Sequence, residues 1–218
     1  MVKVSVYIGT SLDGFIARED GDISWLDSVN KKATPGEDFG FNSFLESVDL
    51  IVMGRKTFEQ VINFNDWSYK DTKIIVMSTK QIETPSNLMK TVTVTKESPA
   101  QLIERLSNES IKHVYVDGGM VIHSFLASRL VNEIPVTIVP ILIGNGKSFS
   151  GILPMDISLQ ILKTTIFESG FVQIQYRVSN QHLRSYRICK FSQKMQFSSQ
   201  KVSKNNCQDC QMTVNSDF

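Results

Sequence analysis

Apolar residues follow two patterns along this chain, short continuous or alternating runs and runs with helical spacing. Runs of about four to eight residues bounded by glycine or polar residues are typical of strands, and apolar residues three and four apart are typical of amphipathic helices. Strands are therefore predicted at residues 2–9, 49–53, 73–77, 91–95, 113–116, 131–143, 159–167 and 171–178. Helices are predicted after Asp38, from Lys56, after Ser98 and after Gly119.

The order of these elements predicts an α/β fold. Strands that alternate with helices favour a parallel sheet. The last two predicted strands are joined by Glu168-Ser169-Gly170, which is typical of a hairpin turn, so the sheet is expected to be mostly parallel with an antiparallel C-terminal edge. Residues 10–17 and 31–37 are predicted to be loops because they contain Asp-Gly and Pro-Gly pairs.

The composition changes near residue 180 and divides the chain into two parts. Residues 1–180 carry the predicted strands and helices, whereas residues 181–218 are polar, basic and poor in aliphatic residues, which predicts a disordered tail. The chain has three cysteines, and the pair Cys207 and Cys210 lies in this tail. A zinc site needs four ligands, so no metal site is predicted.

The overall composition is that of a soluble globular protein and excludes several classes of partner. The chain is 41% hydrophobic and 21% charged with a net charge of +1, which gives no reason to expect nucleic acid or an acidic membrane as a partner. Its apolar runs are shorter than the roughly 20 residues that a membrane helix needs, and its N-terminus has the pattern of a strand rather than a signal peptide. A cytoplasmic location is expected.

Two segments in which a strand, a glycine and a helix follow one another are candidate anion sites. We name Gly54-Arg55-Lys56-Thr57 the first glycine junction and Gly118-Gly119 the second glycine junction. A helix start after a strand presents backbone N–H groups to a phosphate, and ligands of open α/β sheets bind beyond the carboxyl ends of the strands. Ser78-Thr79-Lys80 follows a third strand, so all three segments are expected to meet one ligand such as a dinucleotide; taken singly, each junction is also explained by ordinary helix capping.

Asp38 is the carboxylate with the clearest alternative roles. It precedes an amphipathic helix, where a negative charge is favourable at the positive end of the helix dipole. If it instead faces the crevice at the sheet end, it is a candidate proton donor. The residues alone leave both interpretations open.

Four blocks of this sequence resemble the dihydrofolate reductase-like superfamily. Met53 to Glu59 resembles the glycine–basic–x–threonine–aromatic–glutamate segment of dihydrofolate reductases. Ser11 to Ala17, Val116 to Gly119 and Val139 to Gly146 are similar to the first loop, the paired glycines and the proline–apolar–glycine strand end of the riboflavin-pathway pyrimidine reductase domains. The blocks lie in the same order and span residues 2 to about 179, so the resemblance implies the three-layer fold of that superfamily for residues 1–180.

The resemblance also implies an NADPH site. It assigns the adenosine 2′-phosphate to Arg55, the phosphate bridge to Lys56 and Thr57, and the nicotinamide to Gly9, Thr10, Ile16 and Ala17. The expected cofactor-binding residues are Gly9, Thr10, Ile16, Ala17, Gly54, Arg55, Lys56, Thr57, Ser78, Thr79, Lys80, Gly118, Gly119, Met120, Val121 and Ile122. Met120 stands where dihydrofolate reductases often have a third glycine.

For catalysis the resemblance points to Asp38 and Thr137. Asp38 precedes Gly54 by sixteen residues, the spacing of the catalytic carboxylate in bacterial-type dihydrofolate reductases, and Thr137 lies where that family hydrogen-bonds a threonine to the carboxylate. The resemblance favours a ribosylamino-pyrimidinedione of the riboflavin pathway as substrate, with dihydrofolate as the alternative. It also suggests a homodimer. A non-catalytic nucleotide-binding or scaffold protein remains the alternative from another functional class.

Overall fold

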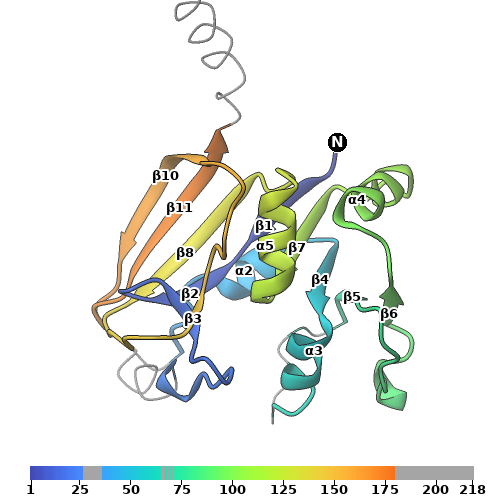
Figure 1. Cartoon of the computed structure of the whole chain (residues 1–218), viewed down its shortest axis with the longest axis horizontal. Helices are drawn as coiled ribbons and strands as arrows, with labels where there is room; N and C mark the ends of the chain where they lie inside the picture. The colour runs from blue at the N-terminus through green and yellow to red at the C-terminus, as the bar shows by residue number, and fades with distance from the viewer. Residues whose placement is uncertain (27–35, 65–66, 68, 70, 180–218) are drawn as a thin grey trace, which may run out of the picture. The chain divides into compact units, whose positions relative to one another are not determined.

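A mixed β-sheet forms the middle layer of the protein (Figure 1). The computed structural model describes residues 1–26, 36–64, 67, 69 and 71–179, and nine strands of this described part join in one sheet. Their order is β10 (Ser158–Ile166), β11 (Val172–Ser179), β8 (Glu133–Val139), β1 (Lys3–Val6), β7 (His113–Asp117), β4 (Leu50–Gly54), β5 (Lys73–Met77) and β6 (Val92–Thr95), while β2 (Ile8–Ser11) also pairs with β8. β3 (Phe15–Ala17) and β9 (Lys147–Ser148) form a separate two-stranded sheet.

Strand directions agree with the expectation from the sequence. β1, β7, β4, β5 and β6 are parallel to one another, and β1 and β2 are parallel to β8. β11 runs antiparallel to β8, and β10 runs antiparallel to β11. The predicted α/β fold with a mostly parallel sheet and an antiparallel C-terminal edge is confirmed.

Helices cover both faces of the sheet and complete three layers. Along β4, Leu50 and Val52 point into one core with α4 (Pro99–Asn108) and α5 (Gly119–Ala127). Ile51 and Met53 point into a second core with α2 (Phe41–Glu46) and α3 (Arg55–Val61). Both faces of this strand are therefore apolar, which explains its continuous apolar run. A 3₁₀ turn, η1 (Ser86–Leu88), precedes β6.

The first predicted strand, residues 2–9, is divided at Tyr7 into β1 and β2. β1 pairs with β7 and β8, whereas β2 pairs with β8 and continues to Ser11. The Tyr7 carbonyl accepts a hydrogen bond from the Tyr115 hydroxyl at 3.1 Å, and the Tyr7 ring packs on Phe41 and Phe44 at centroid distances of 5.5 and 4.8 Å. These side-chain interactions replace the regular ladder at the point where the strand breaks.

Two further predictions differ from the structure. Residues 10–17 were expected to form a loop, but β2 extends into this segment and β3 pairs with β9 far along the chain. The strand predicted at 131–143 is shorter, because β8 ends at Val139 before Pro140, which has no N–H to donate. The predicted tail at 181–218, with Cys207 and Cys210, lies outside the described residues.

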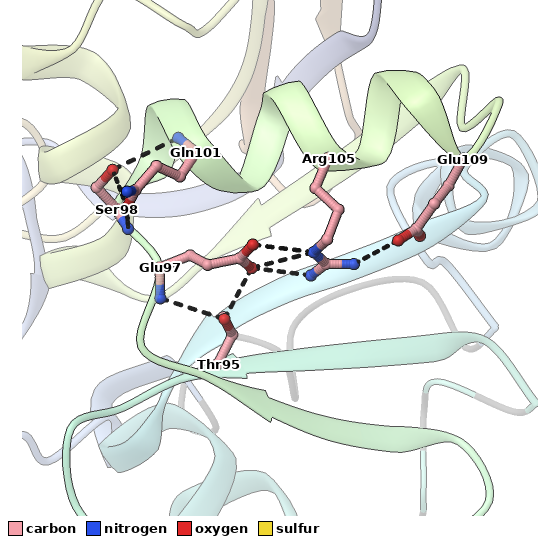
Figure 2. A network of polar contacts seen from close by, with 6 residues as sticks. All are labelled: Thr95, Glu97, Ser98, Gln101, Arg105 and Glu109. Carbon is pink, nitrogen blue, oxygen red and sulfur yellow. Dashed lines mark hydrogen bonds and ion pairs between the residues drawn. The ribbon is translucent and has the colours of Figure 1, made fainter.

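The start of α4 illustrates how local sequence fixes a helix boundary (Figure 2). Ser98 is the N-cap, its hydroxyl accepts a hydrogen bond from the backbone N–H of Gln101, and the Gln101 side chain accepts one from the backbone N–H of Ser98. Pro99 occupies the first helical position, as the sequence predicted. The carboxylate of Glu97 accepts hydrogen bonds from Arg105, about two helical turns further on, so the loop before the helix is tied to the helix itself.

Candidate functional site

The two glycine junctions lie directly against each other at the carboxyl end of the parallel strands. Gly118 has a φ of +85°, and a Cβ at this position would lie 2.2 Å from Oγ1 of Thr57. A Cβ on Gly54 would lie 3.2 Å from Cγ2 of Val121. Because β4 and β7 are neighbouring strands, the topology brings these two helix starts together, and the glycines allow the contact.

Within the second glycine junction, two backbone amides at the start of α5 have no partner inside the helix. The N–H groups of Val121 and Ile122 donate to the Gly118 carbonyl at 3.0 and 2.9 Å, and their side chains are buried. The N–H groups of Gly119 and Met120 precede these first intrahelical bonds. Five residues were predicted to bind cofactor here, Gly118 to Ile122. Of these, Gly119 and Met120 have backbone N–H groups that are not used within α5, and the Met120 side chain is exposed.

A buried carboxylate supports the second glycine junction from within the sheet. Asp117 Oδ1 accepts the Gly118 N–H at 2.7 Å, and Oδ2 accepts the Tyr69 hydroxyl at 3.1 Å. Burial raises the pKa of Asp117, and burial together with the Asp117 charge raises the pKa of Tyr69. The aspartate therefore fixes the backbone ahead of the glycine pair rather than standing free in the crevice.

The first glycine junction contains Arg55, which is predicted to bind the 2′-phosphate, and this side chain already has a partner. Arg55 Nη1 donates to both carboxylate oxygens of Glu59 at 2.6 and 2.8 Å along α3. Lys56 is exposed beside it. A charged ligand at Arg55 would share this guanidinium with Glu59.

The third predicted anion segment follows β5, which is the neighbour of β4 in the sheet. Ser78 and Lys80 form a local turn, in which the Ser78 hydroxyl donates to the Lys80 carbonyl at 2.9 Å and accepts the Lys80 N–H at 3.0 Å. Thr79 and Lys80 are exposed. The N–H of Ser78 donates to the Thr95 carbonyl, which places exposed Lys96 at the next strand end. Lys96 was not among the predicted residues, although the same strand-end rule selects it as a candidate.

The predicted nicotinamide residues lie on two adjoining segments. Gly9 and Thr10 are on β2, where Gly9 is in register with Thr137 of β8. Ile16 and Ala17 are on β3, and Cδ1 of Ile16 would lie 2.8 Å from a Cβ on Gly119. Ile16 therefore packs against the first turn of α5, so the first loop and the second glycine junction form one surface.

Asp38 and Thr137 do not form the hydrogen bond that the resemblance implies. Asp38 accepts the N–H of Gly40 at 2.8 Å and of Asn42 at 2.9 Å, and these amides lower the pKa of its carboxyl. Its carboxylate thus stabilises the start of α2. Thr137 Oγ1 is instead 3.1 Å from Nε2 of Gln173.

Gln173 joins Thr137 to the first strand and was missed by sequence reasoning. Its Nε2 also lies 2.9 Å from the Tyr7 hydroxyl and 3.0 Å from the Phe39 carbonyl. Burial raises the pKa of Tyr7, so the hydroxyl stays protonated and donates to the Phe39 carbonyl. The only sign of Gln173 in the sequence was a polar amide side chain at a position of the last predicted strand that faces the core.

A cavity of about 410 Å³ lies between α2 and the sheet, where residues of β1, β7, β8, β10 and β11 line it. Gln173 and Tyr7 line it together with Phe39, Phe44, His113 and Lys163. The cavity adjoins Phe39 and Gly40, which follow Asp38 in the chain, and its lining is rich in hydrogen-bonding groups. It is large enough for a heterocycle and is a candidate substrate pocket.

Neither a membrane-spanning helix nor a metal-binding cluster is found among the described residues. None of the described helices is long and apolar enough to cross a membrane. The part of the chain that the structure describes contains no cluster of three or more His, Cys, Asp or Glu side chains that could hold a metal ion.

Comparison with known families decides the assignment. Residues 2–173 match the model of the RibD C-terminal domain. The chain belongs to the RibD C-terminal domain family. The family is one of NADPH-dependent reductases, and the resemblance described from the sequence is confirmed at this level.

Relatives of the same family agree with this assignment. A solved structure from Shewanella sp. PV-4, provisionally described as a riboflavin biosynthesis protein, is 33% identical, has a TM-score of 0.76, and covers 82% of this chain and 100% of its own. The uncharacterized protein YwjB of Bacillus subtilis is 29% identical over 177 residues, which is 80% of this chain and 97% of YwjB.

A more distant relative shows the fold alone. The diaminohydroxyphosphoribosylaminopyrimidine deaminase/5-amino-6-(5-phosphoribosylamino)uracil reductase of Thermotoga maritima is 15% identical with a TM-score of 0.64. The match covers 82% of this chain and 57% of that larger one.

Proposed function

We propose that this protein is an NADPH-dependent reductase that transfers hydride to a C=N or C=O group of a pyrimidine-type substrate. The proposed activity resembles that of 5-amino-6-(5-phosphoribosylamino)uracil reductase of riboflavin biosynthesis. The main observation behind the proposal is the contact between Gly118 and Thr57. It brings the starts of α3 and α5 together at the point proposed for the cofactor phosphates, and a side chain at Gly118 would block that contact. Family membership supports the same cofactor.

The residues present fit a dinucleotide phosphate. Arg55, Ser78, Thr79 and Lys80, with Lys96 added by the structure, supply hydroxyls and positive charge around the position proposed for the adenosine 2′-phosphate. Lys56, Thr57 and the amides of Gly119 and Met120 face the proposed pyrophosphate position from both sides.

The nicotinamide end is proposed to lie over the surface formed by β2, β3 and α5. Gly9 and Thr10 border the proposed nicotinamide position on one side, and Ile16 and Ala17 border it on the other. When bound, the reduced nicotinamide supplies the hydride, and the chain's own residues position the two reactants and exclude water.

The substrate is proposed to enter the cavity beside α2. The Tyr7 O–H and the Gln173 N–H groups are already donated within the protein, so these two side chains offer acceptor oxygens to the polar edge of a pyrimidine, while Phe39 and Phe44 supply apolar walls. Thr137 holds the Gln173 amide in place. Asp38 would act from the start of α2 as an anion that accepts a hydrogen bond from a ring N–H.

Dihydrofolate is the second candidate substrate, and the state of Asp38 favours it. Two backbone amides keep this carboxylate ionised, which suits binding of a protonated pterin ring. The proposal also includes a cytoplasmic location and a homodimer. Support for a dimer comes from the edge strand β10, where Leu159, Ile161 and Ile166 are 43%, 59% and 77% exposed.

Loss of NADPH absorbance with a panel of substrates tests the proposal. The panel contains the riboflavin-pathway intermediate, related pyrimidines, pterins and dihydrofolate, and NADPH binding is measured separately by titration. Turnover with a pyrimidine supports the first candidate, and turnover with dihydrofolate alone supports the second. Binding without turnover of any compound would favour a non-catalytic nucleotide-binding protein, whereas absence of NADPH binding would refute both reductase candidates.

A further inference from the structure

Asp13 joins two loops that are far apart in the sequence. It lies between β2 and β3, and its Oδ2 accepts the N–H of Gly144 at 2.7 Å and that of Ile143 at 3.2 Å. The Ser11 hydroxyl and these amides favour the carboxylate and hold the pKa of Asp13 below its ordinary value. Asp13 is therefore an anionic acceptor whose partners belong to a distant loop.

Other contacts show that the two loops form one unit. The N–H of Leu12 donates to the Ile141 carbonyl at 2.8 Å, and the N–H of Phe149 donates to the Gly14 carbonyl at 3.2 Å. β3 then pairs with β9. A Cβ on Gly146 would lie 2.2 Å from the Ala17 carbonyl oxygen, so the backbones of the two loops are too close together for a side chain at this position. We name residues 12–17 and 141–149 together the double loop.

The double loop determines where Ile16 lies. Ile16 is the central residue of β3, between Phe15 and Ala17, which pair with Ser148 and Lys147. Its side chain packs on the first turn of α5, where a Cβ on Gly119 would lie 2.8 Å from Cδ1. A shift of β3 would therefore move this side chain away from the second glycine junction.

We propose that Asp13 is a positioning residue for the nicotinamide end of the cofactor site. Its carboxylate links residues 12–17 to residues 141–149 by hydrogen bonds and so holds Ile16 against the start of α5. The inference rests on the proposed function, because that function places the nicotinamide on this surface. Asp13 itself acts through the loop and is not a catalytic residue.

The geometry separates the effect of Asp13 on the two ends of the cofactor. The adenosine end is proposed to lie by Arg55 and Ser78, on β4–α3 and after β5, whereas the double loop contacts α5 through Ile16. Loosening the double loop should therefore weaken contacts with the nicotinamide and leave the adenosine 2′-phosphate position unchanged. General unfolding would weaken both.

The test compares full-length wild type with Asp13→Asn, which keeps the side-chain shape but loses the negative charge. Asp20→Asn is the matched control, because Asp20 accepts the N–H of Asp22 at 2.9 Å within its own turn and does not join the two loops. NADPH and 2′,5′-ADP, which lacks the nicotinamide, are titrated against each protein. Amide hydrogen exchange of Ile143 and Gly144 is followed in parallel.

For Asp13→Asn we expect NADPH affinity to fall about tenfold, the size of one hydrogen bond to a charged group, and 2′,5′-ADP affinity to stay within about twofold. Exchange at Gly144 should accelerate about tenfold or more, and where a substrate is turned over kcat should fall more than KM rises. Asp20→Asn should resemble wild type in every measurement.

Three outcomes overturn the inference and can be told apart. Unchanged NADPH affinity together with unchanged exchange at Ile143 and Gly144 shows that Asp13 positions nothing. Equal losses for NADPH and 2′,5′-ADP show a general structural role. A wild type that binds neither ligand refutes the proposed function itself, and this result appears before any variant is compared.

Discussion

Replacement of Arg55 by alanine gives the sharpest test of cofactor recognition. In the structure its guanidinium pairs with Glu59, and the two side chains are 29% and 45% exposed. A partly exposed i,i+4 pair stabilises a helix by only about 0.3–0.5 kcal/mol, so Arg55→Ala should remain folded. A charge-assisted hydrogen bond to a phosphate contributes about 1.5–3 kcal/mol, and its loss should weaken NADPH binding about ten- to 150-fold.

NADH provides the internal reference for this prediction, because it lacks the 2′-phosphate. Its affinity should barely change in Arg55→Ala. Fluorescence or calorimetric titration of both cofactors gives the ratio of the two dissociation constants, and that ratio is the quantity to compare. Equal losses for NADPH and NADH would refute the assignment of Arg55 to the 2′-phosphate.

Glu59 refines the same experiment because it competes with the phosphate for one guanidinium. Glu59→Gln should tighten NADPH binding about twofold, which corresponds to the 0.3–0.5 kcal/mol of the pair, and should leave NADH unchanged. Arg18→Ala is a control with the same spacing, since Arg18 forms an i,i+4 pair with Asp22 at 3.8 Å. It should not alter the NADPH to NADH ratio.

Three further substitutions test other parts of the structure. Gly118→Ala should lower the free energy of unfolding by about 1–3 kcal/mol and abolish NADPH binding, because the new Cβ would meet Thr57. Gly170→Ala is the control, since Gly170 has a similar positive φ without that contact, and this variant should retain NADPH binding. Thermal unfolding measures the stability of both variants, and titration measures their NADPH affinity. Ser98→Ala removes the side-chain cap of α4 and should cost about 1 kcal/mol in denaturant unfolding with cofactor affinity unchanged. Asp38→Asn should reduce turnover more than NADPH affinity, and an unaffected rate would remove Asp38 from the mechanism.

The glycine junctions were predictable because their signals are local. An apolar strand followed by Gly54 or Gly118 and then by helical spacing defines each junction within a few residues. The rule that ligands lie at the carboxyl ends of parallel strands then brings the junctions together without further information. The contact between Gly118 and Thr57 fits that rule.

Features that depend on distant partners were not predictable in the same way. The break at Tyr7 is set by Tyr115, Phe41 and Phe44, which belong to other elements. The pairing of β3 with β9 joins segments more than a hundred residues apart, and neither strand has a periodicity of its own because each is only two or three residues long. Loop closure over such a distance leaves no mark in the local sequence.

The two interpretations of Asp38 are physically linked. Each carboxylate oxygen accepts one backbone amide and has a second lone pair, so capping α2 does not exhaust its capacity to accept hydrogen bonds. The same amides lower the pKa of Asp38, which favours its ionised form in the ligand-free protein and argues against a role as proton donor at neutral pH. If it takes part in the reaction, it does so by stabilising a protonated substrate ring, with the proton coming from water. A turnover that rises as the pH falls toward the pKa of the substrate ring, and loses this dependence in Asp38→Asn, would distinguish this role from simple helix capping.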